Sequence, residues 1–200
     1  MRKLIMLLGL MLYSCKSTPD VSKLNIDIRK CLEVRSKKIS DGQVNLFNSY
    51  QKIEEKLIKE DFLKDNTKSS YYKLFNEFEK SFEGDIESTQ KYIILYKLIN
   101  NDIENYYLIN SISSFLTPFE CNRFMIEKNS LNTSEYYSDY YSVLMRFVNS
   151  DSISDWALNN ELLNSTPDRE FSNIIYRTPI ISLIYENLKY QFENKEMIRK

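Results

Sequence analysis

The sequence predicts an all-α fold, a single irregular helical bundle or array of about seven to nine helices. Three observations lead to this prediction. Apolar residues recur three and four positions apart along most of the chain, which places them on one face of a helix. The alternation of apolar and polar residues that is typical of strands is nowhere sustained. All four prolines directly follow a threonine, a pair that is typical of helix starts.

The first residues have the pattern of a secretory signal peptide. Met1, Arg2 and Lys3 form a short basic start, and an apolar run extends from Leu4 to Leu12. This run is far shorter than the roughly 20 apolar residues that a helix needs to span a bilayer. We therefore expect a leader that is removed on export and not a permanent transmembrane anchor.

The end of this leader resembles the lipobox of bacterial lipoprotein precursors. Leu12, Ser14 and Cys15 match that motif, whereas Tyr13 is bulkier than its usual residue. The resemblance covers residues 1–15 and implies cleavage before Cys15, a diacylglycerol on the cysteine sulfur and often an acyl chain on its amine. Two or more such chains hold a protein firmly to a membrane. The alternative is an ordinary signal peptide with a chance cysteine.

On this interpretation the chain has three parts, namely a cleaved signal peptide at residues 1–14, a lipidated cysteine with a short tether at 15–22, and one helical domain at 23–200. Because Lys16 stands where aspartate would imply retention in the inner membrane, the resemblance favours the outer membrane in a Gram-negative cell. Loss of the leader removes two of the 27 basic side chains, which leaves 25 against 28 acidic ones. This balance gives no reason to expect a nucleic-acid partner.

Threonine–proline pairs set the expected helix starts. Threonine caps a helix by accepting a hydrogen bond from a free backbone N–H, and proline suits the first helical position because it has no N–H to leave unpaired. Thr117–Pro118 and Thr178–Pro179 are therefore expected to open helices, and Glu120 would complete a capping box. With apolar periodicity setting the other bounds, the expected helices cover residues 20–38, 42–64, 68–83, 86–115 with a break near Asn100, 118–129, 134–149, 152–164, 167–176 and 179–195.

The composition excludes several kinds of catalytic and metal site. The chain has no histidine, so Ser–His–Asp and Cys–His arrangements and the usual zinc sites are excluded. Its three glycines are far apart, whereas phosphate-binding loops need them in close succession. We expect no catalytic residue, no bound metal and no cofactor. Clustered carboxylates keep open the alternative of an Asp/Glu-dependent enzyme acting on envelope glycans: Glu54, Glu55, Glu60, Asp61, Glu83, Asp85 and Glu87.

Cys31 and Cys121 allow two interpretations. Exported proteins reach compartments in which paired thiols can form a disulfide. A bond between these cysteines would close a loop of about 90 residues, which in the chain-entropy model contributes roughly 4–5 kcal/mol of stability. Both cysteines also have apolar neighbours, so they could equally be buried free thiols that pack as small hydrophobic residues.

Adjacent tyrosines on the expected helices suggest a surface for a partner. Tyr136–Tyr137 and Tyr140–Tyr141 each place two rings about 100° apart on a helix, so both members cannot point straight into one core. The outer rings would then lie at the margin of the core, where tyrosine is favoured at protein interfaces. Tyr136, Tyr137, Tyr140 and Tyr141 are the candidate partner-binding residues, and a broad core stripe is the alternative.

Together these features favour a non-enzymatic lipoprotein that is anchored to a membrane and binds another protein in the cell envelope. An immunity-type inhibitor of a secreted toxin and an accessory subunit of an envelope machine fit equally well. Two other classes stay open. One is the glycan enzyme, which would need a deep cleft with two facing carboxylates of raised pKa. The other is a surface-exposed structural lipoprotein.

Overall fold

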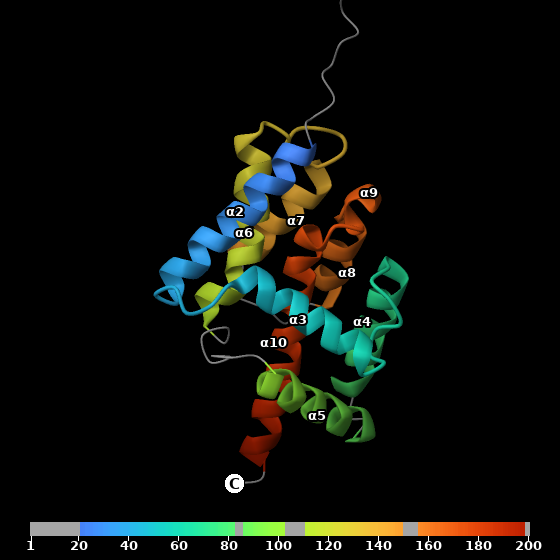
Figure 1. Ribbon diagram of the computed structural model, residues 1–200. Coiled ribbons are helices and arrows are strands. Elements are labelled where there is room, and N and C mark those ends of the chain that lie inside the picture. Colours follow the sequence, from blue (N-terminus) through green and yellow to red (C-terminus); the bar gives the residue numbers. More distant parts are fainter. Residues whose placement is uncertain (1–20, 83–85, 103–110, 150–155, 199–200) are drawn as a thin grey trace, which may run out of the picture.

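The computed structural model describes residues 21–82, 86–102, 111–149 and 156–198. Over these ranges the backbone forms nine helices and no strand, which confirms the all-α prediction (Figure 1). In chain order they are α2 (Val21–Ile39), α3 (Leu46–Lys59), α4 (Lys68–Phe82), α5 (Ile86–Asp102), α6 (Ile112–Lys128), α7 (Ser138–Asn149), α8 (Trp156–Ser165), α9 (Asp168–Phe171) and α10 (Ile174–Ile198).

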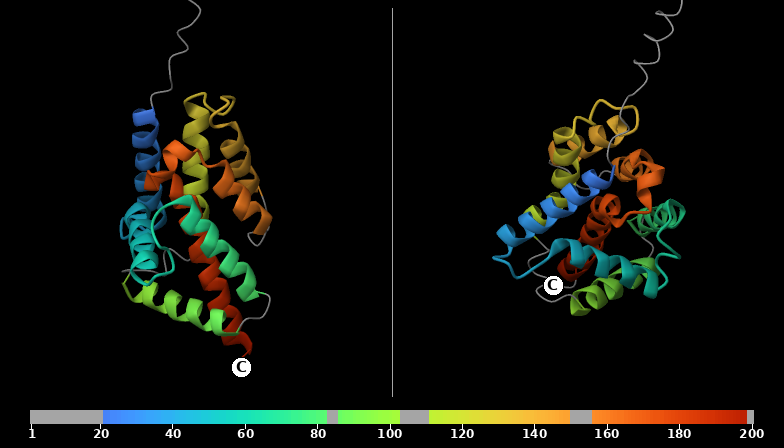
Figure 2. Two further views of the ribbon diagram at one scale, coloured as in Figure 1. Left: turned by 90° about the vertical axis from the view of Figure 1, so that its right-hand side faces the viewer. Right: turned by 45° about the horizontal axis from the view of Figure 1, so that its top comes forward.

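The long helix α10 lies at the centre of the array. It contacts α2, α3, α5, α6, α8 and α9. Helix α5 crosses α10 near the C-terminal end of α10 (Figures 1 and 2). Residues 175–185 are buried without interruption, so this stretch is enclosed on every side. A helix that is buried all round needs apolar residues on its whole circumference. Ile180, Ile181, Leu183 and Ile184, none of them measurably exposed, supply this apolar surface.

Two of the predicted helix starts are wrong, because Pro118 lies inside α6 and Pro179 lies inside α10. Helix α6 begins earlier, at Ile112, where the Ser111 side chain caps it by accepting a hydrogen bond from the Ser114 N–H at 3.1 Å. An interior proline normally disrupts a helix, since it removes one hydrogen bond and its ring crowds the carbonyl four residues earlier. Both helices therefore need a local reason to continue through their prolines.

That reason is a side-chain donor for each carbonyl that a proline leaves without its usual partner. In α6 the Tyr50 hydroxyl donates to the Ser114 carbonyl oxygen at 3.0 Å. In α10 the Thr178 hydroxyl donates to the Ile175 carbonyl oxygen at 2.7 Å, and the Asn122 amide donates to the same oxygen at 3.4 Å. Buried carbonyls are costly when unpaired, so these donors allow the two helices to run through their prolines.

Other helix bounds also differ from the predicted ones. Helix α3 begins at Leu46 and not at residue 42, because Gly42 takes a positive φ of 83° that belongs to a turn. Helix α7 begins at Ser138 and not at residue 134. The expected helix 167–176 divides into the single turn of α9 and the start of α10.

The remaining expected helices start and end close to the predicted residues, apart from the start expected at residue 152, which lies outside the described part of the chain. Helix α5 ends at Asp102, near the break expected at Asn100. The rest of the expected helix 86–115 includes residues 103–110, which lie outside the described part of the chain. The predicted signal peptide and lipidation site also lie outside it, and the first described helix begins at Val21.

We predict that Tyr50→Phe lowers the free energy of unfolding by about 1–3 kcal/mol, because the Ser114 carbonyl would lose its donor inside the core. In a Pro118→Ala background the restored N–H of residue 118 can bond to that carbonyl, so the same tyrosine substitution should cost less. Chemical denaturation of the four proteins of this double-mutant cycle measures the coupling. Additive effects of the two substitutions would contradict this account of how α6 tolerates Pro118.

Candidate functional site

A disulfide joins α2 to α6, where the sequence had left two interpretations open. Cys31 and Cys121 are bonded with their Cα atoms 5.6 Å apart. Cys31 is 9 % exposed and Cys121 is fully buried, so the bond is shielded from solvent. The two helices run in opposite directions. This is seen from the ion pair next to the disulfide, in which Arg35, later in α2, meets Glu120, earlier in α6.

Further along the same seam, a groove of about 400 Å³ opens between the two helices. On α2 its residues lie three and four positions apart, which places them on one helical face, and the residues from α6 follow the same spacing. The groove is lined by Arg35, Lys38, Ile39, Ser113, Leu116, Thr117 and Glu120. We call this feature, which lies at the C-terminal end of α2, the α2–α6 groove.

The floor of the α2–α6 groove combines apolar side chains with the buried Thr117, and charged side chains stand at its edges. Ile39 and Leu116 are only partly buried against the core, so each leaves apolar surface facing the groove. The Thr117 hydroxyl donates to the Ser113 carbonyl oxygen at 2.6 Å, which leaves its oxygen lone pairs available as acceptors. Such a combination of apolar surface with a few fixed polar groups is typical of binding sites.

Two exposed apolar side chains lie on the same helices next to the groove. Val34 of α2 and Phe124 of α6 are each 46 % exposed. Val34 is one turn from Lys38, and Phe124 is one turn from Glu120, so each extends a row of residues that reaches the groove. The apolar surface therefore continues along the seam between the two helices beyond the groove itself.

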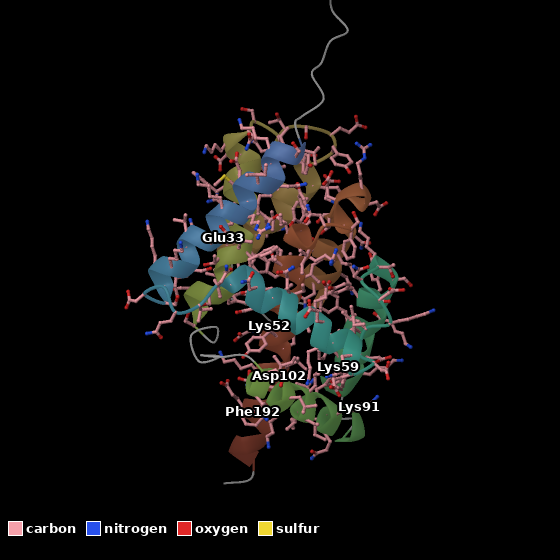
Figure 3. All side chains as sticks on the ribbon, in the orientation of Figure 1. Glu33, Lys52, Lys59, Lys91, Asp102 and Phe192 are labelled. Atoms are coloured by element: carbon pink, nitrogen blue, oxygen red, sulfur yellow. A yellow bond between two sulfur atoms is a disulfide. The ribbon has the colours of Figure 1, made fainter. Side chains whose placement is uncertain are left out.

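The charge of this region is predominantly positive. The lining of the α2–α6 groove has two basic side chains, Arg35 and Lys38, and one acidic side chain, Glu120. Glu120 is paired with Arg35, and Glu33, which belongs to α2 (Figure 3) but does not line the groove, is paired with Arg29. Lys37 and Lys38 form no ion pair with any residue that the structure describes, and they stand in the last turn of α2, where the helix dipole favours cations.

The candidate tyrosine surface is largely wrong, because most of these rings belong to the core. Tyr137 and Tyr140 are fully buried, and Tyr141 is partly buried against the core. Burial raises the pKa of Tyr137 to about 12. Tyr136, at 39 % exposure, is the most exposed of the four, and the guanidinium of Arg169 lies over its ring.

The buried rings build a polar network inside the core. The Tyr140 hydroxyl donates to the Asn122 side-chain oxygen at 3.3 Å, and the Tyr137 and Tyr176 hydroxyls lie 3.5 Å apart. Because Asn122 also donates to the Ile175 carbonyl, α6, α7 and α10 meet through these contacts. The tyrosines thus join three helices, and a partner could not reach Tyr137 or Tyr140 in this fold.

A second hollow, of about 340 Å³, lies over a buried ion pair between Glu54 and Arg177. Arg177 donates from Nε and Nη2 to the two Glu54 oxygens at 2.6 and 2.9 Å, and from Nη1 to the Phe171 carbonyl at 2.6 Å. The Tyr71 hydroxyl also donates to Glu54. Since the two charges neutralise each other and hold α3, α4 and α10 together, we assign Glu54 a role in the core.

The other clustered carboxylates that kept the enzyme alternative open are placed as follows. Glu60 pairs with Lys56 at the C-terminal end of α3, Glu55 lines the hollow over the Glu54–Arg177 pair, and Asp61 is exposed in the turn that follows α3. Glu83 and Asp85, and the side chain of Glu87, lie outside the described residues. Within the described ranges, no group of three or more acids or cysteines could hold a metal ion.

Glu170, on α9, is a buried acid that the sequence analysis did not single out. It is 4 % exposed, and its Oε1 has no hydrogen-bond partner among the described residues. Burial raises the pKa of this carboxyl, while Arg169 beside it acts in the opposite direction. Tyr137 and Tyr176, from the core network, also lie close enough to interact with its charge.

The α2–α6 groove could not be recognised from the sequence with a helix start predicted at Pro118. That boundary removed Ser113, Leu116 and Thr117 from α6 and so hid the row of residues that faces α2. A helical row running through Ser113, Leu116 and Glu120 is visible in the sequence once the helix is allowed to continue through the proline.

Comparison with protein families, with curated proteins and with solved structures finds no match for this chain. Across the ranges that the structure describes, no helix combines the length and the apolar character needed to cross a bilayer. A functional proposal must therefore be built on the residues of the chain itself.

We predict that replacing both Cys31 and Cys121 by alanine lowers the free energy of unfolding by about 4 kcal/mol, because the unfolded chain regains the freedom of a 90-residue loop. Urea denaturation of the oxidised wild type and the double variant measures the difference. The reduced wild type should match the double variant closely. An unchanged midpoint would show that the core alone holds α2 against α6.

We predict that Glu170→Gln stabilises the protein increasingly as the pH rises from 4 to 8. A carboxyl whose pKa is raised by folding supports the folded state below its ordinary pKa and opposes it once the pH passes the raised value. The neutral amide avoids that penalty, so the melting temperature of the variant should exceed that of the wild type at pH 8 and approach it at pH 4. Glu135→Gln, at an exposed acid, is the matched control. A gain that does not vary with pH would contradict the proposed cause.

Proposed function

We propose that this protein is an exported lipoprotein, anchored to a membrane of the cell envelope through Cys15, whose helical domain binds another protein at the α2–α6 groove without catalysing a reaction. The leader and the lipobox at residues 1–15 support the anchor. The groove between α2 and α6 supports the binding role, since it offers apolar surface, hydroxyl groups and cations in one place.

The disulfide is the observation that carries the proposal. Cytosolic thiols are kept reduced, whereas the periplasm and the cell surface allow disulfides to persist. A buried bond between Cys31 and Cys121 is therefore expected of a chain that leaves the cytosol. Both cysteines belong to the folded domain, so the disulfide supports export independently of the leader.

The position of the groove supports a partner in the aqueous space. Helix α2 begins at Val21, six residues after Cys15, and these residues can span at most about 20 Å. Arg35 lies 14 residues further along the helix, which is about 21 Å at 1.5 Å per residue. The lipid would thus hold one end of α2 near the bilayer while the groove lies at the other end.

Cys15→Ser tests the anchor. We expect the wild-type protein to take up labelled palmitate and to sediment with membranes, and the variant to do neither, because it lacks the sulfur that carries the diacylglycerol. Full-length protein that remains in the cytosol, or label that persists in the variant, would overturn the anchor.

Site-specific photo-crosslinking in the native host tests the binding role. A crosslinking amino acid at Ser113, which lines the groove, should form a defined adduct with an envelope protein. The same amino acid at Asn76, an exposed position on α4, is the control and should not form that adduct. Absence of any adduct specific to Ser113 would overturn the groove as the binding site.

A further inference from the structure

We infer that the partner occupies the α2–α6 groove with an acidic amphipathic segment, which lays its apolar side chains on the groove floor and directs its carboxylates toward Arg35 and Lys38. This inference rests on the proposed function and adds the chemistry of the partner to it. It depends on the unbalanced charge of the groove, on its apolar content and on its place in the molecule.

Charge complementarity indicates that the partner segment carries negative charge. Arg35 and Lys38 line the groove, and Lys38 forms no ion pair with a described residue, whereas the acid on the opposite wall, Glu120, is already paired with Arg35. Asp41, in the turn that follows α2, forms no ion pair with Lys38. A carboxylate from a partner would find charge-assisted donors there, and a cationic segment would meet like charge.

The apolar surface of the groove indicates that the partner segment also carries apolar side chains. Ile39 and Leu116 form the floor, and the exposed Val34 and Phe124 extend apolar surface along the seam. Exposed aromatic and aliphatic side chains beside a hollow are typical of protein-binding surfaces. A highly charged segment without apolar residues would leave this surface exposed to water, so the segment must be amphipathic.

The dimensions of the groove favour a segment over a globular face. Its volume of about 400 Å³ accommodates a few side chains, and its walls are two antiparallel helices. A helix or extended segment can lie along such a seam and insert side chains three and four positions apart, as in other complexes in which an amphipathic helix occupies a groove.

Anionic lipid headgroups share the carboxylate's charge, but the fold argues against them as the occupant. The cations lie at the end of α2 that is remote from the anchored end. Membrane-binding surfaces also rely on several clustered cations, with about 1 kcal/mol of attraction for each. The groove offers only two cations, Arg35 and Lys38, and one of them is shared with Glu120, which is fewer than a membrane-binding surface uses.

The test selects peptides from a random display library of 16-residue sequences on the full-length lipidated protein in neutral detergent micelles. We expect the selected peptides to be rich in Asp and Glu, with apolar residues three and four positions apart. Their affinity should fall about tenfold or more in an Arg35→Gln/Lys38→Glu variant, because one of the two cations that contact the carboxylates is removed and the other is replaced by an acid. Added salt should weaken their binding to the wild type.

A matched variant distinguishes an effect of the groove residues from an effect of the protein's net charge. Lys64→Gln/Lys80→Glu makes the same change of net charge at exposed positions outside the groove, and it should leave peptide affinity unchanged. Circular dichroism and a non-reducing gel would show that both variants keep their helices and the Cys31–Cys121 bond. Leu116→Ser, which removes apolar floor without changing charge, should also weaken binding.

Several outcomes would overturn the inference. They are selected peptides that are basic or uncharged, selected peptides that bind the groove variant as well as the wild type, and a library that yields no binder. Binding to phosphatidylglycerol vesicles that depends on Arg35 and Lys38, with no such dependence for peptides, would assign the groove to a membrane instead. The Ser113 crosslink is measured separately. If that adduct forms but the library yields no acidic peptides, the proposed function stands and only the inferred chemistry of the partner is wrong.

Discussion

The rest of the structure depends on the complete burial of the first half of α10. Burying a polar group without a partner is costly, so a helix that contains Arg177, Thr178, Pro179 and Ser182 can be central only if other elements satisfy these residues. Glu54 binds the guanidinium, the Ser182 hydroxyl donates to the Phe115 carbonyl, and Thr178 itself bonds to the Ile175 carbonyl that the proline frees. These requirements determine which helices can lie beside α10.

The same contacts determine where α6 and α2 lie. Tyr50 of α3 bonds to the Ser114 carbonyl of α6 and lies 3.3 Å from the Ser182 hydroxyl of α10, so a single ring connects three helices. With α6 held against α10 in this way, the Cys31–Cys121 bond then holds α2 on its outer side. The α2–α6 groove is therefore formed by helices that are each fixed from within, and its residues can stay exposed without loosening the fold.

This arrangement separates the residues that hold the fold from those that can meet a partner. The buried tyrosines and the Glu54–Arg177 pair use their polar groups inside the core. The lysines at the end of α2 have no such internal role, and the apolar surface beside them is left uncovered by the described parts of the chain. A cationic groove with an apolar floor, at the C-terminal end of α2, is thus the surface most suited to an acidic partner.

The sequence by itself determined the helical class, most of the helices and the two cysteines that could pair, because apolar periodicity and cysteine count are local or countable properties. It could not show that α6 and α10 continue through Pro118 and Pro179. The donors that satisfy the carbonyls freed by these prolines include Tyr50 and Asn122, which are distant in sequence. It could not separate Tyr136 from Tyr137 either, because a helical position becomes core or surface only when neighbouring helices cover it. The tertiary structure decided these points, along with the groove, because each depends on which surfaces two distant segments present to each other.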